Sequence, residues 1–398
     1  MLKTDRLYYT DCYLREFEAR VLKVDREAER FRVYLDRSAF YPESGGQRAD
    51  RGTLAGMPVL ELADEGEAIA HVLERQPQGE IIRGEIDWAR RFGHMQQHTG
   101  QHLLSAAFEK TGNYATASFH MGEEASTIDL NSDRLGRRQI EEAEDLANQA
   151  VFEDRAVRIF FRPAGEAGRL DLRKPTVRQG DVRLVEVEQF DLSACGGTHV
   201  SRTGALGMIL VRKFERIKDR TRVEFVCGRR AMKTARQDYL LLDEASRLFS
   251  ASPQHLPARV RRLAEEQRAA IRAQEKLLDR LSEYTGRELW QSAPEIHGRK
   301  LLSRVFTEAE HLEAKRVAHA IQKQPSCAAL IGVKGNPATL YFAQSPGGGW
   351  DMGSLVRQTT ARFGGKGGGT RDFAQGGGLS EEKLEEALEF AKGLLGQH

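Results

Sequence analysis

The feature that most constrains this chain is a pair of histidines four residues apart, His98 and His102, inside a stretch with a helical pattern. Apolar and small side chains recur every three or four residues from Asp87 to about Lys110, and Asp87 is a favourable N-cap. Residues i and i+4 of a helix share one face with Cβ atoms about 5–6 Å apart, so both imidazoles can reach one divalent metal. His94 lies one turn earlier on that face, and the helix pattern alone does not decide which pair binds.

A second cluster, Cys195-Gly-Gly-Thr-His199, supplies a thiolate and an imidazole separated by small residues that permit a tight turn. An HxxxH motif that stands alone is as often a pair of core or surface histidines as it is a metal site. The two clusters together form a nitrogen and sulfur donor set of the number that tetrahedral zinc prefers. The sequence therefore predicts a zinc site with about one Zn²⁺ per chain.

Three stretches resemble a known family: RFGHMQQHTGQHLLSAAF at 91–108, FDLSACGGTHV at 190–200, and FYPESGGQ at 40–47. They resemble the editing domain of alanyl-tRNA synthetase and its free-standing relatives, the AlaX proteins, which hydrolyse mischarged seryl- or glycyl-tRNA(Ala). In that family the HxxxH and CxxxH pairs hold the zinc. The resemblance therefore implies the ligands His98, His102, Cys195 and His199, and it gives His94 no counterpart in the motif.

Composition is that of an ordinary soluble protein. Of the 398 residues, 40% are hydrophobic and 30% are charged, and no apolar run approaches the length of a membrane span. The first residues lack the apolar core of a signal peptide, and four cysteines in so long a chain do not indicate a disulfide framework. We therefore expect a cytoplasmic protein that does not associate with membranes.

The net charge of +2 does not indicate nucleic acid, so a nucleic-acid surface has to be local. Residues 202–230 do carry more Lys and Arg than Asp and Glu. Two interpretations fit this stretch: a solvent-exposed strand face, or a strip that faces phosphates.

Residues 1–86 are predicted to form a small β-barrel domain, because short alternating strands are separated by turn residues. The stretch Phe40–Gln47 interrupts them, and the resemblance implies that Gly45, Gly46 and Gln47 lie beside the editing pocket and bind substrate or tRNA. Relatives usually carry Thr two residues before the Phe, where this chain has Ser38. The hydroxyl is kept and a methyl group is lost, which bears on side-chain discrimination.

Residues 87–230 are predicted to form the zinc-bearing α/β editing domain. Its Thr116-Ala-Ser118 stretch resembles the substrate-facing strand of the family. An enzyme that removes serine but spares alanine has to recognise the serine hydroxyl, and a site built to hydrogen-bond that group discriminates strongly. Ser38, Thr116 and Ser118 are the candidate catalytic-site residues for this task.

Residues 231–285 are predicted to be a helical, coiled-coil-like linker. Ser252-Pro253 has the pattern of a helix start, and a heptad seam follows from Leu256 to Leu281 with polar interruptions at Gln267 and Gln274. Such a seam fits either packing within the chain or a homodimer through these helices.

Residues 286–398 are predicted to form an α/β domain that ends with a glycine-rich loop and a final helix. A glycine run is usually a linker, but between regular elements it suits close approach of the backbone to phosphate or sugar. The segment resembles the C-terminal DHHA1 domain of alanyl-tRNA synthetase. We expect it to bind tRNA, with Lys366 and Arg371 facing phosphates.

These features predict an α+β protein with a zinc site, and the resemblance implies a zinc-dependent aminoacyl-tRNA deacylase whose partner is tRNA(Ala). It would act in trans on mischarged Ser-tRNA(Ala), and also on Gly-tRNA(Ala), while sparing Ala-tRNA(Ala); the chain is too short to contain an aminoacylation core as well. If all four ligands bind at once, the zinc has no open position and can be purely structural. Two alternatives therefore stay open: a hydrolase for another aminoacyl-tRNA, such as that of threonyl-tRNA synthetase, and a non-enzymatic tRNA-binding module.

Overall fold

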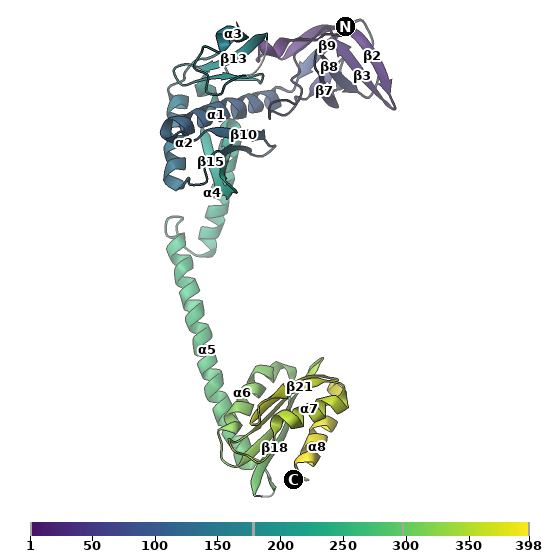
Figure 1. Cartoon of the computed structure of the whole chain (residues 1–398), viewed down its shortest axis with the longest axis vertical. Coiled ribbons are helices and arrows are strands. Elements are labelled where there is room, and N and C mark those ends of the chain that lie inside the picture. Colours follow the sequence, from purple (N-terminus) through teal and green to yellow (C-terminus); the bar gives the residue numbers. More distant parts are fainter. Residues whose placement is uncertain (1, 177–179, 297, 397–398) are drawn as a thin grey trace. The chain divides into compact units, whose positions relative to one another are not determined.

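The computed structural model describes residues 2–176, 180–296 and 298–396 (Figure 1). The chain divides into two compact units, Met1–Glu244 and Ala245–His398. Both units combine helices with sheets, so the predicted α+β class is confirmed. Within the described ranges, every helix is too short or too polar to span a bilayer. The finer division into four domains stays a prediction.

The first unit begins with an antiparallel sheet of strand order β6-β5-β9-β2-β3-β8-β7. Its strands are β2 (Glu16–Glu27), β3 (Arg30–Leu35), β5 (Gly52–Leu54), β6 (Met57–Pro58), β7 (Glu61–Glu65), β8 (Ala68–Leu73) and β9 (Ile81–Ile86). A short parallel pair, β1 (Asp5–Arg6) and β4 (Arg37–Ser38), adjoins it. In β9, buried and exposed residues alternate as in a strand with one face on a core. Phe17, Leu35 and Phe40 belong to that core.

The two ends of this sheet belong to one extended segment, residues 57–65. β6 pairs with β5, and directly after it the Val59 N–H donates to the carbonyl of Gly52. The next residue, Leu60, donates its N–H to the carbonyl of Val72 on β8. One stretch of chain thus links both ends of the sheet. The predicted small barrel itself stays a prediction, since the strand order is that of a sheet with two ends.

The rest of the first unit is built around α1 (Trp88–Gly112). One sheet has the order β10-β11-β16-β15 and another the order β12-β13-β14, and α2 packs against α1. The elements are β10 (Thr116–Met121), β11 (Ser126–Leu130), α2 (Arg137–Phe152), β12 (Val157–Pro163), α3 (Ala164–Ala167), β13 (Asp181–Val187), β14 (Asp191–Ala194), β15 (Ile209–Ile217), β16 (Arg220–Cys227) and α4 (Gly228–Leu248). Helix α4 follows β16 directly and continues to Leu248, past Glu244 at the end of the first unit.

The second unit contains the long helix α5 (Leu256–Ser292) and a sheet of order β17-β18-β19-β20-β22-β21 (Figure 1). Its other elements are β17 (Glu295–Ile296), β18 (Arg299–Phe306), α6 (His311–Gln322), β19 (Cys327–Val333), β20 (Ala338–Gln344), α7 (Met352–Phe363), β21 (Lys366–Gly369), β22 (Phe373–Leu379) and α8 (Leu384–Leu395). Strand β19 is buried along its whole length, as expected of a central strand.

The glycine-rich tract of this unit is not a loop, which corrects the expectation from sequence. Most of its glycines lie in the antiparallel hairpin β21–β22 at the edge of the sheet. A Cβ at Gly367 would collide with Val356, and a Cβ at Gly376 would collide with Thr360. Both collision partners lie on α7. The glycines therefore let this helix pack closely on the hairpin. This packing accounts for glycine at these positions without any ligand.

Candidate metal centre

Helix α1 carries the two histidines of the HxxxH motif. Its first turn is capped by Asp87, whose carboxylate accepts a hydrogen bond of 3.1 Å from the Arg90 N–H. It ends at Asn113, which has the left-handed conformation typical of a helix C-terminus. Between these ends, all residues from Met95 to Phe108 are buried. Packing on every side holds this part of the helix, and with it the two imidazoles, in place.

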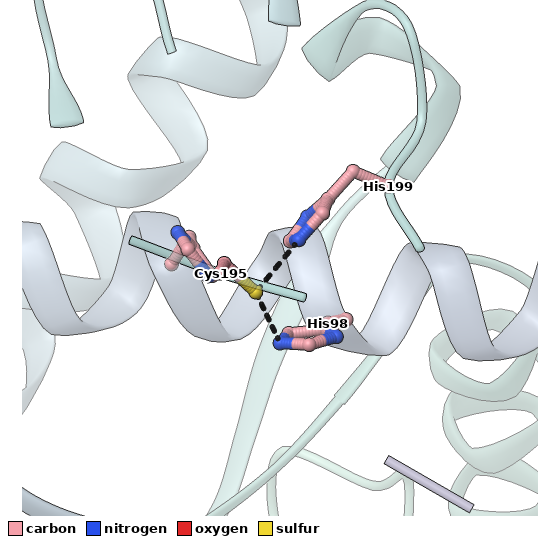
Figure 2. Close-up of side chains that lie close together, drawn as sticks. His98, Cys195 and His199 are labelled. Carbon is pink, nitrogen blue, oxygen red and sulfur yellow. Dashed lines mark hydrogen bonds between the residues drawn. The ribbon is translucent and has the colours of Figure 1, made fainter. Parts of the chain in front are cut away.

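The four residues predicted as metal ligands come together. One donor atom from each of His98, His102, Cys195 and His199 lies within 4.8 Å of the others. The Sγ atom of Cys195 is 3.4 Å from Nε2 of His98 and 3.3 Å from Nε2 of His199 (Figure 2). Zinc bond lengths in a tetrahedral site separate nitrogen and sulfur ligands by about 3.3–3.6 Å. The donor set and its spacing therefore fit a zinc ion.

Each histidine of this cluster uses its other ring nitrogen for a hydrogen bond. The Nδ1 atom of His98 is 2.8 Å from Oε1 of Gln47, and that of His102 is 2.8 Å from a carboxylate oxygen of Asp191. The Nδ1 atom of His199 is 3.1 Å from Oγ1 of Thr99. Acceptors at Nδ1 fix the ring orientation and leave Nε2 as the donor for a metal. This arrangement is a second observation that supports a metal centre.

Charge at the cluster is set by burial and by the neighbours. Burial raises the pKa of the Cys195 thiol, but the imidazoles of His98 and His199 lower it well below its ordinary value. Burial lowers the pKa of His199 to about 3. Burial also acts to lower the pKa of His102, but the hydrogen bond to the Asp191 carboxylate raises it to about 9. A thiolate and a neutral His199 are the forms that bind zinc, and His102 has to lose its Nε2 proton for a cation to bind.

The turn that carries Cys195 approaches α1 closely. A Cβ at Gly197 would collide with the imidazole of His98, so glycine is needed at this position. The side chain of Gln47 accepts a second hydrogen bond, from the Thr198 N–H at 3.0 Å, and donates one to the Thr198 hydroxyl at 2.9 Å. The small residues between Cys195 and His199 thus allow a tight turn and let that turn pack against α1 and Gln47.

His94 is not part of the cluster, which settles the question that the helix pattern left open. It is 1% exposed, and its Nδ1 atom has no hydrogen-bond partner among the described residues. Burial and the positive charges of Arg90 and Arg230 lower the pKa of His94 to about 3. Its surroundings are cationic, and they differ completely from those of the four clustered residues.

A cavity of about 220 Å³, here called the centre cavity, is lined by His98, His102 and Cys195 and by both predicted strand hydroxyls, Thr116 and Ser118. The Thr116 hydroxyl donates to Ser105 Oγ at 2.8 Å. Ser118 donates to Asp129 at 2.8 Å. A small cavity with hydroxyl groups beside a metal centre is suited to a small polar acyl group.

The remaining predicted residues of the first unit lie in different places. Gly45 lines the centre cavity, whereas Gly46 packs against Phe119, where a Cβ would collide with the backbone. Gln47 is buried and holds His98, as described above, and is absent from the cavity lining. In the structure, Gln47 therefore positions the imidazole of His98. The sequence had predicted that Gln47 contacts the substrate or tRNA directly.

Ser38 is fully buried and does not line the centre cavity. Its Oγ lies 2.8 Å from Nε2 of His71 and accepts a hydrogen bond of 3.2 Å from the Phe40 N–H. The other His71 nitrogen, Nδ1, lies 3.1 Å from the carbonyl of Val33 and must donate to it. Nε2 therefore accepts, and the Ser38 hydroxyl donates. The structure does not bring Ser38 together with Thr116 and Ser118.

Lys366 and Arg371 lie in the second unit. Lys366 begins β21, and Arg371 lies in the turn between β21 and β22; both side chains are exposed. The Arg371 Nε donates to the carbonyl of Trp350 at 3.4 Å. Both cations are therefore available to solvent on one hairpin.

The sequence did not point to several residues of the site. Asp191 and Thr99 orient two of the imidazoles, and Arg173 and Lys174 add positive charge to the lining of the centre cavity. Arg173 Nε also donates to Asp191 at 2.7 Å. The one available signal was the short spacing of Asp191 and Thr99 from the two metal motifs.

Two family models match the chain. The model for the threonyl and alanyl tRNA synthetase second additional domain matches residues 182–223, which include the cysteine turn. The model for the DHHA1 domain matches residues 298–397. Both matches agree with the resemblances seen in the sequence.

Individual relatives extend the match over the whole chain. The alanine–tRNA ligase of Pyrococcus abyssi is 32% identical over 99% of this chain, which spans 44% of that protein's length. The C-Ala domain of Aquifex aeolicus alanyl-tRNA synthetase is matched at 26% identity over 26% of this chain and 98% of that domain, with a TM-score of 0.25. The alanyl-tRNA editing protein AlaX-L of Pyrococcus horikoshii is 32% identical over 99% of this chain and 99% of its own length. This chain therefore belongs to the family of the alanyl-tRNA editing protein AlaX-L.

Proposed function

We propose that the protein is a zinc-dependent deacylase that acts in trans on mischarged tRNA(Ala), with Ser-tRNA(Ala) as its main substrate and Gly-tRNA(Ala) as a second one. The observation that carries the proposal is the buried His98, His102, Cys195 and His199 cluster, which opens into a small cavity with strand hydroxyls. Membership of the AlaX-L family supports the tRNA part of it.

The four clustered residues would hold the zinc through three Nε2 atoms and one thiolate. A bound zinc ion supplies Lewis acidity, which polarises an ester carbonyl or lowers the pKa of a water. Gln47, Asp191 and Thr99 keep the three imidazoles oriented through their Nδ1 atoms. An aminoacyl ester is already activated, so positioning within the cavity contributes a large part of the rate.

Recognition of serine would come from the hydroxyl groups of the cavity. Thr116 and Gln101 both donate to Ser105 Oγ, at 2.8 Å and 2.9 Å, so they form a connected polar strip on one side. A serine hydroxyl can form a further hydrogen bond with this strip, whereas the methyl group of alanine cannot. Ser118, already bonded to Asp129, would serve as a second contact.

Ser38 would act indirectly. Its hydroxyl is bonded to His71 and to the Phe40 N–H, at the start of the stretch that leads to Gly45. We assign it the positioning of that stretch at the cavity. Gly45 is the residue of the stretch that lines the cavity and is therefore suited to contact the substrate.

A deacylation assay with seryl-, glycyl- and alanyl-tRNA(Ala), each with and without a chelator, tests the proposal. We expect rapid release of serine, slower release of glycine, no release of alanine, and loss of activity after metal removal. Thr116→Val should reduce the preference for serine while metal content stays unchanged, because only the hydroxyl is removed.

The same assay tells the alternatives apart. Hydrolysis of a different mischarged tRNA, with seryl-tRNA(Ala) left intact, would show an editing enzyme of other specificity. Tight tRNA binding without release of any amino acid would show a binding module with structural zinc. Either result contradicts the proposed function.

A further inference from the structure

A second cavity, of about 450 Å³, lies between the first half of α1 and the start of α4. It is here called the cationic cavity. Five of its lining residues are positively charged and one is negatively charged; they are Arg90, Arg229, Arg230, Lys233 and Arg236, and Glu123. No residue of the metal cluster lines it. It is therefore separate from the centre cavity, although His94, which lines it, precedes His98 by one helical turn.

None of these five cations forms an ion pair within the described part of the chain, although the charge of Glu123 acts on both Arg90 and Arg230. Arg90 and Arg230 each donate to a backbone carbonyl, of Ala49 and of Gly122, both at 3.0 Å. The carboxylate of Glu123 is engaged 3.4 Å from Arg48. Burial and the surrounding guanidinium groups lower the pKa of both Arg90 and Arg230. Mutual repulsion of this kind is relieved when an anion enters.

The basic residues just before α4 behave differently. Arg212 pairs with Asp238, Lys213 with Glu215, and Arg222 with Asp129. These three cations on the strands are therefore neutralised. Arg229 and Arg230, at the end of the same stretch, line the cationic cavity instead.

Two further features of the cavity favour a negatively charged ligand. The positive end of the α4 dipole points toward its start at Gly228, yet the first turn contains Arg229 and Arg230 and no acidic residue. Positive side chains at that end are unfavourable unless an anion is bound. His94, which is 1% exposed, lines the cavity, and its Nδ1 atom has no partner among the described residues.

We propose that the cationic cavity is a phosphate-binding site that takes backbone phosphates of the tRNA. The guanidinium groups of Arg90 and Arg230 supply charge and N–H donors, and Lys233 and Arg236 extend the charged strip along α4. The charge of the cavity is the reason to expect a phosphate group as its ligand. The assignment of this phosphate to tRNA rests on the proposed function. Tethering the RNA one helical turn from the metal centre would help to place its esterified end in the centre cavity.

A matched pair of substitutions at Gly93 tests the site. Gly93 lines the cavity, and a Cβ there meets nothing within 4 Å, so the first side-chain atom can be added without a collision. Gly93→Glu adds a carboxylate among the cations, and Gly93→Gln adds a side chain of the same size without charge. Binding of tRNA(Ala) that carries no amino acid is measured for both variants and the wild type between 50 and 200 mM salt. Thermal unfolding is followed with inorganic phosphate and with chloride at equal ionic strength.

We expect Gly93→Glu to bind tRNA about ten-fold more weakly than Gly93→Gln, with a salt slope smaller by about 0.7–0.9. Inorganic phosphate should raise the unfolding temperature of the wild type and of Gly93→Gln, and not that of Gly93→Glu. Equal tRNA affinities and salt slopes for the two variants overturn the proposal, including the case in which only free phosphate binds. Uncharged tRNA is used throughout, so a failure of deacylation would contradict the proposed function without touching this result.

Discussion

Cys195 provides the sulfur donor of the cluster, and removing it leaves only the three imidazoles. Cys195→Ala should therefore reduce zinc from about one ion per chain to a small fraction of that, as measured by metal analysis of the purified protein. Cys327→Ala is the matched control, since that buried cysteine lies in the second unit and should leave zinc unchanged. Undiminished zinc in the Cys195 variant would rule out the assignment.

His71 makes the first unit sensitive to acid. Burial lowers the pKa of His71 to about 4, whereas an unfolded histidine titrates near 6.5. Between these values the unfolded chain binds a proton that the folded chain excludes, so stability falls as pH drops from about 6.5 toward 4 and levels off below. The loss from this one group is about 3 kcal/mol.

Chemical denaturation of the wild type and of His71→Gln, each at pH 7 and pH 4.5, isolates this contribution. Glutamine keeps a neutral side chain at both pH values. The wild type should therefore lose more stability than the variant between the two conditions. Equal losses would show that the imidazole is already protonated in the fold.

At the scale of single elements, α5 presents apolar side chains to solvent. Val260, Leu263, Ile271, Leu277 and Leu281 are between 44% and 65% exposed. All but Ile271 belong to the predicted heptad seam. These seam residues are not buried by packing within the described chain, so they are available to pack against a second copy of the chain. We expect a homodimer at micromolar concentration in sedimentation experiments.

Leu263→Lys should shift that dimer toward monomer, because it places a charge in the seam. Glu265→Lys changes an exposed residue on the opposite side of the helix and should leave the association state unchanged. A wild-type protein that sediments as a monomer would exclude the seam as an interface.

Element boundaries show what could be read from sequence. The start of α1 was predicted within one residue because its N-cap is local: Asp87 bonds the Arg90 N–H three residues on. The start of α5 was not. Ser252 and Pro253 have the pattern of a helix start, but the Ser252 hydroxyl lies 2.9 Å from His255 Nδ1 and the helix begins at Leu256.

Non-local contacts explain the other differences at the site. The two metal motifs were predicted because metal ligands follow fixed spacings, and the family resemblance singled out His98 and His102 where the spacing left His94 open. The roles of Gln47 and Asp191 depend on contacts across 51 and 89 residues of sequence, which no local pattern encodes. The glycine tract was misassigned as a loop because these glycines are required by the packing of α7 on the hairpin, a tertiary contact that glycine content does not reveal.

At the scale of the whole molecule, the two units are expected to divide the work. Every clustered residue and cavity hydroxyl belongs to the first unit, whereas the exposed cations Lys366 and Arg371 belong to the second. Replacing both cations by Ala should raise KM for aminoacyl-tRNA and leave kcat unchanged. The salt slope of tRNA binding should fall by up to about 2, because each lost phosphate contact removes about 0.9.

Lys392→Ala, on α8 of the same unit, is the control for this pair, because it removes a cation that lies outside the hairpin and 3.4 Å from Glu389. If the double variant binds tRNA as the wild type does at every salt concentration, the hairpin serves the fold or association instead.

Gln47 has a consequence for how the protein acquires its activity. Its one side chain joins the N-terminal sheet to α1 and to the cysteine turn, through contacts that span 51 and 151 residues. Contacts so distant along the chain form slowly, because much loop entropy is lost before they yield any interaction. The orientation of His98 is therefore completed only once three remote segments have docked. Metal binding during refolding should therefore be a late event that follows the docking of the N-terminal sheet onto α1.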